Sequence, residues 1–150
     1  MMRKIISLLI LFAAPVAADY DRDNWGFESY SLEPQRGYYT HKFCEKMHVE
    51  HVVSLKDAYA SGGKTWETEL KITFANDLEN HVAACATVNL SKGAALPAIF
   101  LQRSTDGKGR DYQIVRWCSY LATYYVVKKK YGLSFAGNNA ALFKQCHLEI

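Results

Sequence analysis

The chain has 150 residues, of which 49% are hydrophobic, and its 18 lysines and arginines exceed its 15 acidic side chains by three. A chain of this length and composition can bury one compact core but is too short for two ordinary domains. It contains no internal repeat and no low-complexity tract, which excludes repeat and low-complexity classes.

The first 18 residues have the pattern of an export signal. Arg3 and Lys4 form a basic start, Ile5 to Ala14 is an apolar run too short to span a bilayer as a stable helix, and Val16-Ala17-Ala18 fits the small-residue rule for cleavage. We expect cleavage before residue 19, with an uncleaved membrane anchor as the alternative. No other segment is apolar enough to cross a membrane, so we expect a secreted or periplasmic protein without membrane association.

Residues 19–36 are predicted to be an arm that packs on the domain, which itself covers residues 37–150. The arm is rich in aromatic and acidic side chains and contains Pro34, a composition typical of an extended segment.

The predicted elements alternate between short strands and helices, which predicts an α+β fold. In chain order they are a strand beginning over 37–40, a strand over 49–55, a helix over 55–60, an amphipathic helix over 65–74, a helix over 89–95, a polar loop over 102–109, a long helix over 112–131 and a shorter helix over 137–147. Trp66, Leu70 and Phe74 recur at helical spacing and are interpreted as a core stripe. Pro97 is expected to stop the helix over 89–95.

Four cysteines in an exported chain predict two disulfides, because the number is even and the compartment is oxidising. Three connectivities are possible. We favour Cys44–Cys85, which would join the strand entering the candidate site to the segment before Asn89, and Cys118–Cys146, which would join the last two helices.

A zinc site is the alternative interpretation of the cysteines and histidines between residues 44 and 85. Cys44, His48, His51 and Cys85 could form a structural zinc site, since three residues separate the first two ligands. A zinc protease fits poorly. The segment from His48 to His51 is one residue short of H-x-x-E-H, and H-E-x-x-H does not occur in the chain.

A carboxylate, an imidazole and two amides follow one another in a short window: Glu50, His51, Asn80 and Asn89. Carboxylate and amide oxygens are ligands that Mg²⁺ and Mn²⁺ prefer, and a neutral histidine can accept a proton near pH 7. A cation and a base together are what phosphodiester hydrolysis requires. Neighbours on a strand point to opposite faces, so Glu50 and His51 can share one site only where the strand ends or bends.

The order of these residues resembles the HNH, or ββα-metal, endonucleases, in particular secreted bacterial members similar to the C-terminal HNH domain of GmrSD. Glu50-His51-Val52-Val53 matches the first-strand signature, Phe74 to Asn80 matches the middle segment, and Asn89 to Gly93 matches the Asn-x-x-Lys-Gly of the helix. The similarity covers roughly residues 36–135. Ser54 and His81 depart from it, since relatives usually have proline and a hydrophobic residue there.

The resemblance implies a ββα-metal core with additional C-terminal helices and a role for each matched residue. His51 would be the general base, Asn80 would brace the loop that orients it, and Glu50 and Asn89 would bind Mg²⁺ or Mn²⁺. Lys92 would contact a phosphate. The implied reaction is hydrolysis of phosphodiester bonds in DNA, or in RNA, with a 5′-phosphate left at the cut.

Basic residues concentrate in the second half of the chain. Residues 19–85 contain 7 basic and 12 acidic side chains, whereas residues 86–135 contain 8 basic and 2 acidic ones. The candidate nucleic-acid contacts are Lys92, Arg103, Lys108, Arg110 and Arg116, which would make binding salt-dependent. The run from Lys128 to Lys130 is interpreted as a solvated helix face.

The predicted function is a secreted, monomeric, Mg²⁺- or Mn²⁺-dependent endonuclease. One alternative is a periplasmic endonuclease I-like nuclease, which shares Glu-His-Val-Val but usually has arginine at the position of Lys92. Another is a non-catalytic nucleic-acid-binding or interbacterial-toxin module on the same fold, for which an acidic immunity-type inhibitor would be the partner.

Overall fold

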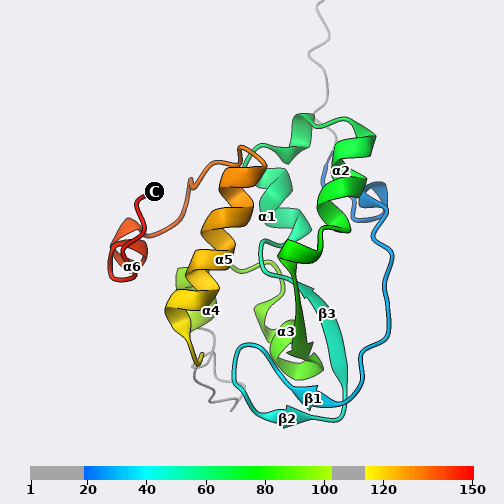
Figure 1. The fold of residues 1–150 in the computed structure, drawn as a ribbon. Coiled ribbons are helices and arrows are strands. Elements are labelled where there is room, and N and C mark those ends of the chain that lie inside the picture. The colour runs from blue at the N-terminus through cyan, green and yellow to red at the C-terminus, as the bar shows by residue number, and fades with distance from the viewer. Residues whose placement is uncertain (1–18, 103–113) are drawn as a thin grey trace, which may run out of the picture.

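An antiparallel hairpin that continues into a helix forms the centre of the molecule. The computed structural model describes residues 19–102 and 114–150. Strand β3 (Met47–His51) pairs with β4 (His81–Cys85), with Met47 opposite Cys85 and His51 opposite His81. Helix α3 (Ala86–Lys92) follows β4 directly and lies beside the hairpin (Figure 1). The fold is therefore mixed α+β, as predicted. Strand β3 ends at His51 and not at the predicted residue 55, and β4 was not among the predicted elements.

The segment between β3 and β4 is helical. It contains α1 (Leu55–Ala60), the 3₁₀ turn η2 (Gly63–Thr65), α2 (Thr68–Ala75) and the 3₁₀ turn η3 (Leu78–Asn80). Helix α1 has its predicted bounds, because Ser54 caps it by accepting a bond from the Asp57 backbone N–H at 3.1 Å. The departure from proline at position 54 thus has a local structural role.

The predicted core stripe over 65–74 holds for Trp66 and Phe74, which pack in the core, but is wrong for Leu70. Helix α2 begins only at Thr68, so Trp66 precedes it, and Leu70 is 39% exposed. Phe74 is fully buried as expected. Trp66 still packs on Phe74, with ring centroids 5.5 Å apart, but it does so from the preceding turn.

The helices after the hairpin are displaced from their predicted bounds. Helix α3 ends at Lys92 because Gly93 turns the chain with a φ of +52°, a conformation that favours glycine. The chain then forms α4 (Pro97–Gln102), which the sequence did not predict, α5 (Trp117–Lys130) and α6 (Ala140–Lys144). The predicted loop over 102–109 lies almost wholly outside the described residues.

The N-terminal arm runs along one side of the molecule from α2 to the small sheet (Figure 1). It contains the 3₁₀ turn η1 (Asp23–Trp25) and leads into β1 (Gln35–Arg36), which pairs with β2 (Phe43–Cys44). Trp25 is 1% exposed and packs against Trp66 and Phe74. The strand predicted to begin over 37–40 is wrong, since these residues form the turn between β1 and β2.

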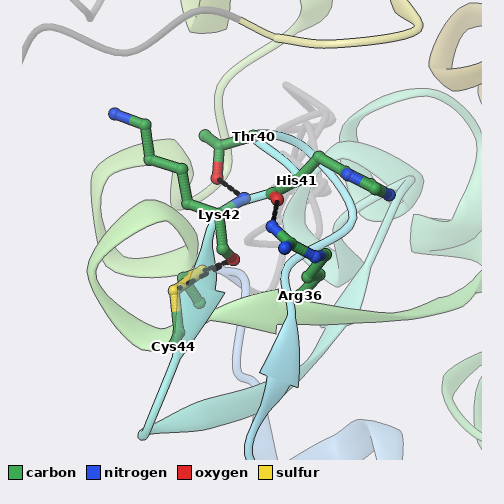
Figure 2. Close-up of a disulfide and its surroundings, with 6 residues drawn as sticks. Arg36, Thr40, His41, Lys42 and Cys44 are labelled. Carbon is green, nitrogen blue, oxygen red and sulfur yellow. Dashed lines mark hydrogen bonds between the residues drawn. A yellow bond between two sulfur atoms is a disulfide. The ribbon is translucent and has the colours of Figure 1, made fainter.

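Both predicted disulfides are confirmed. Cys44–Cys85 joins β2 to β4, and Cys118–Cys146 joins α5 to the segment after α6. The structural zinc alternative is therefore wrong, because two of its four ligands are bridged. Figure 2 shows the turn beside Cys44, where the Arg36 guanidinium donates to the His41 carbonyl at 3.0 Å. A Cβ on Gly37 would lie 2.5 Å from the Cys85 Sγ, so only glycine fits at this position.

A buried polar cluster joins α1 to α5, which lie side by side in Figure 1. We call Asp57, Tyr124 and Lys128 the α1–α5 cluster. Lys128 donates to Asp57 Oδ1 at 2.8 Å and Tyr124 donates to Asp57 Oδ2 at 2.6 Å. The solvated face predicted over 128–130 is wrong for Lys128, which is 0% exposed, and Lys130 pairs with Asp77 and Glu79.

Candidate functional site

A pocket of about 420 Å³ opens beside the end of β3 and the middle of α3. Glu50, His51 and Asn89 all line it. Because β3 ends at His51, two consecutive residues reach the same pocket despite the alternation of a strand. We call Glu50, His51, Asn80, Asn89 and Lys92 the site cluster. The structure thus brings together the residues that the resemblance assigned to base and metal.

His51 is fixed through one ring nitrogen. His51 Nε2 lies 2.7 Å from the Ala75 carbonyl oxygen, and His81 Nε2 lies 2.9 Å from the same oxygen. The two Nε2 atoms are 3.2 Å apart. A carbonyl oxygen has two lone pairs and no hydrogen to give, so the network assigns the N–H of each histidine to Nε2. Nδ1 of His51 is then the nitrogen that can accept a proton.

His51 is neutral at physiological pH. Burial lowers its pKa from 6.5 to about 4, although the bond to the Ala75 carbonyl opposes this shift. Phe27 of the arm lies edge-on to the imidazole, with ring centroids 4.7 Å apart. A neutral, oriented imidazole has the protonation state of a general base.

Asn80 holds the chain immediately after His51. Its side chain accepts from the Val53 N–H at 2.8 Å and donates to the Val53 carbonyl at 3.0 Å. Its backbone carbonyl accepts from the Val52 N–H at 2.9 Å. Asn80 is 0% exposed and does not line the pocket, so its contacts are with the backbone of residues 52 and 53.

Glu50 and Lys92 form a buried ion pair. The Lys92 ammonium is 0% exposed and donates to Glu50 Oε1 and to the His51 carbonyl. Tyr39 donates to the same carboxylate oxygen at 3.4 Å. Burial raises the pKa of Glu50 above its ordinary value. The charge of Lys92 acts in the opposite direction, because it favours the ionised carboxylate. The prediction that Lys92 contacts phosphate is corrected: its charge is committed to Glu50.

Asn89 projects from α3 and is half-buried. Its Nδ2 donates to His48 Nδ1 at 3.1 Å, which leaves its Oδ1 as an acceptor. Within residues 19–102 and 114–150, no group of three or more His, Cys, Asp or Glu side chains could hold a metal ion. Glu50 and Asn89 each bring a side-chain oxygen to the lining of the pocket.

Of the other four predicted nucleic-acid contacts, one does not line this pocket and three lie outside the described residues. Arg116 is exposed, precedes α5 with a φ of +58°, and does not line the pocket. Arg103, Lys108 and Arg110 lie outside the described residues. The basic residues that do line it, Arg22 and Lys56, were missed by the sequence analysis. The available signal was that Lys56 follows His51 by five residues.

Comparisons with known proteins support export but identify no family. No family model matches the chain, and no solved structure matches it. The chain is 35% identical over 88 residues to an uncharacterized secreted protein of Arthroderma benhamiae. The match covers 57% of this chain and only 39% of the relative. With two disulfides, the likeness places the protein among secreted or periplasmic proteins. In the part of the chain described, no helix has the length and apolar character to cross a membrane.

Proposed function

We propose that the protein is a secreted, metal-dependent HNH endonuclease that hydrolyses phosphodiester bonds of DNA. The observation that carries the proposal is the pocket at the end of β3, where a neutral imidazole, a buried carboxylate and a helix-borne amide converge. The strand–strand–helix order of the elements that supply them agrees with the resemblance in sequence. RNA is the second substrate to be tested.

His51 acts as the base in this proposal. Its Nε2–H is bound to the Ala75 carbonyl, so Nδ1 takes the proton from an attacking water. Asn80 keeps the imidazole in place by fixing residues 52 and 53. A base that is neutral down to acidic pH suits an exported enzyme, because it retains its acceptor when the surroundings are mildly acidic.

Glu50 and Asn89 would hold Mg²⁺ or Mn²⁺, which supplies neutralisation of the charge that develops on the phosphate. Lys92 supports the role of Glu50 as a metal ligand. By pairing with Glu50 it keeps the carboxylate ionised in a buried position, where an unpaired carboxyl group would tend to take up a proton. Lys92 is therefore a positioning residue in this proposal.

The test is cleavage of supercoiled plasmid by the oxidised mature protein, residues 19–150, with Mg²⁺, Mn²⁺ or EDTA. We expect nicking with either ion and none with EDTA. His51→Asn should slow nicking by roughly 100-fold or more, the usual contribution of a general base. His41→Asn is the matched control, because His41 is exposed in the β1–β2 turn and its φ of +55° is tolerated by asparagine.

Two outcomes would contradict the proposal in different ways. A wild-type protein that cuts neither plasmid nor RNA with any divalent ion has no nuclease function. A His51→Asn variant that cuts as fast as His41→Asn would leave the activity in place but remove His51 as the base.

A further inference from the structure

The pocket carries two basic side chains that come from outside the strand–strand–helix unit. Arg22 comes from the N-terminal arm and Lys56 from α1, and both line the pocket with Glu50 and His51. We propose that Arg22 and Lys56 bind the nucleic-acid phosphates on either side of the bond to be cut. This inference rests on the nuclease function proposed above and names the surface that receives its substrate.

Arg22 is positioned by aromatic side chains of its own segment. Its guanidinium lies 5.9 Å from the centre of the Phe27 ring, and Phe27 in turn packs on His51. Burial raises the pKa of the Tyr20 hydroxyl, and the charge of Arg22 acts in the opposite direction. Tyr20 lines the pocket and packs on Tyr59 of α1, with ring centroids 5.5 Å apart. These contacts hold an exposed guanidinium beside the proposed base.

Lys56 reaches the pocket because of its place in α1. The next residue, Asp57, points into the interior toward α5, while Lys56 is exposed and borders the pocket. No ion pair joins Arg22 or Lys56 to any residue that the structure describes. Both positive charges are therefore available to a ligand.

The balance of charge around the pocket favours an anion. Among the described lining residues Glu50 is the one acid, and Lys92 already neutralises it. Arg22 and Lys56 then give the mouth of the pocket a net positive charge. A guanidinium binds phosphate through two parallel hydrogen bonds, and an ammonium binds it as a point charge. A phosphodiester backbone offers such anions at regular spacing.

The experiment compares Arg22→Gln, Lys56→Gln and the double variant with a control of equal charge change. Arg36→Gln with Lys46→Gln is that control, because both residues are exposed and neither lines the pocket. KM, kcat and the salt dependence of KM are measured on a DNA duplex. We expect each pocket substitution to raise KM by roughly tenfold and the double variant to lower the salt slope by about two, with kcat little changed.

Further variants separate binding from folding. Arg22→Lys should keep the salt slope, since it keeps the charge, and the thermal unfolding midpoint of every variant identifies a folding defect. A pocket double variant with the KM and salt slope of the control double variant would overturn the inference while leaving the nuclease function intact. Absence of cleavage by the wild type would overturn both.

Discussion

Two buried lysine–carboxylate pairs lie within residues 19–102 and 114–150, and they differ in what surrounds the carboxylate. In the α1–α5 cluster, Asp57 receives Lys128 on one oxygen and Tyr124 on the other. In the site cluster, Lys92 and Tyr39 both donate to Oε1 of Glu50, and Glu50 lines the pocket. Asp57 also borders a hollow, but both of its oxygens are bound by protein donors.

A buried ion pair can therefore serve two purposes. The α1–α5 cluster satisfies its carboxylate completely, so it fixes how two helices pack. The site cluster satisfies one carboxylate oxygen and leaves the other without a donor among the bonds described, next to a neutral base. Such a carboxylate is suited to take an additional ligand.

The largest expected effect is on stability and comes from removing either lysine. Lys128→Met and Lys92→Met each leave a buried carboxylate without its counter-ion, which should cost about 3 to 5 kcal/mol. Millimolar Mg²⁺ should restore part of the loss in Lys92→Met, because a cation bound to Glu50 stabilises the folded state. It should leave Lys128→Met unchanged. Urea unfolding with and without Mg²⁺ measures both effects.

The two lysine variants are controls for each other. An equal response to Mg²⁺ would mean that the pocket gives Glu50 no special affinity for a cation. Both ion pairs would then serve only to stabilise the fold.

The next largest effect is on catalysis and comes from neutralising the carboxylates. Glu50→Gln and Asp57→Asn both leave a buried lysine unpaired, so both should be less stable. Only Glu50→Gln should slow DNA cleavage, by roughly 100-fold, because it weakens a metal ligand. Initial rates, corrected for the folded fraction by circular dichroism, measure the difference. Equal rates per folded molecule would exclude Glu50 from the site.

The most gradual expected effect is the pH dependence that His51 gives to stability. Its pKa is about 4 in the folded protein, against 6.5 in the unfolded chain. Between these values the unfolded chain binds a proton that the folded protein does not, so stability falls as pH falls from 6.5 to 4 and the loss levels off below 4. The loss should be roughly 3 kcal/mol, spread over the whole of this pH range.

Urea unfolding at several pH values checks this dependence. His51→Asn should lack the component between pH 6.5 and 4, whereas Lys128→Met should retain it, since the α1–α5 cluster does not contact His51. A wild type and a His51→Asn variant with the same pH profile would show that burial does not perturb this imidazole.

Sequence alone predicted best where a local signal acts alone. Helix α1 has its predicted bounds because a serine cap precedes it, and both disulfide pairings are correct. The convergence of Glu50, His51 and Asn89 on one pocket was also predicted, because the order of residues along the chain carried it.

Prediction failed where the tertiary structure decides. A lysine before a glycine at a helix end is usually solvated, yet Lys92 is buried, and only the packing against Glu50 explains why. Leu70 fits a helical stripe but faces solvent, since the core is instead closed by Trp25 from the arm. Arg22 lies 29 residues before His51, so nothing local to either position reveals that they share a pocket.

Gly37 has a consequence for how this protein can vary in evolution. Its lack of a side chain is required chiefly by the Cys85 sulfur, which a Cβ would approach to 2.5 Å. A lineage that loses the bridge by substitution of Cys85 also loses this sulfur, which is the tightest of the contacts that restrict position 37. Among homologues, glycine at 37 and the cysteine pair should therefore be inherited together, and alanine or serine at 37 should appear mainly in chains that lack the bridge.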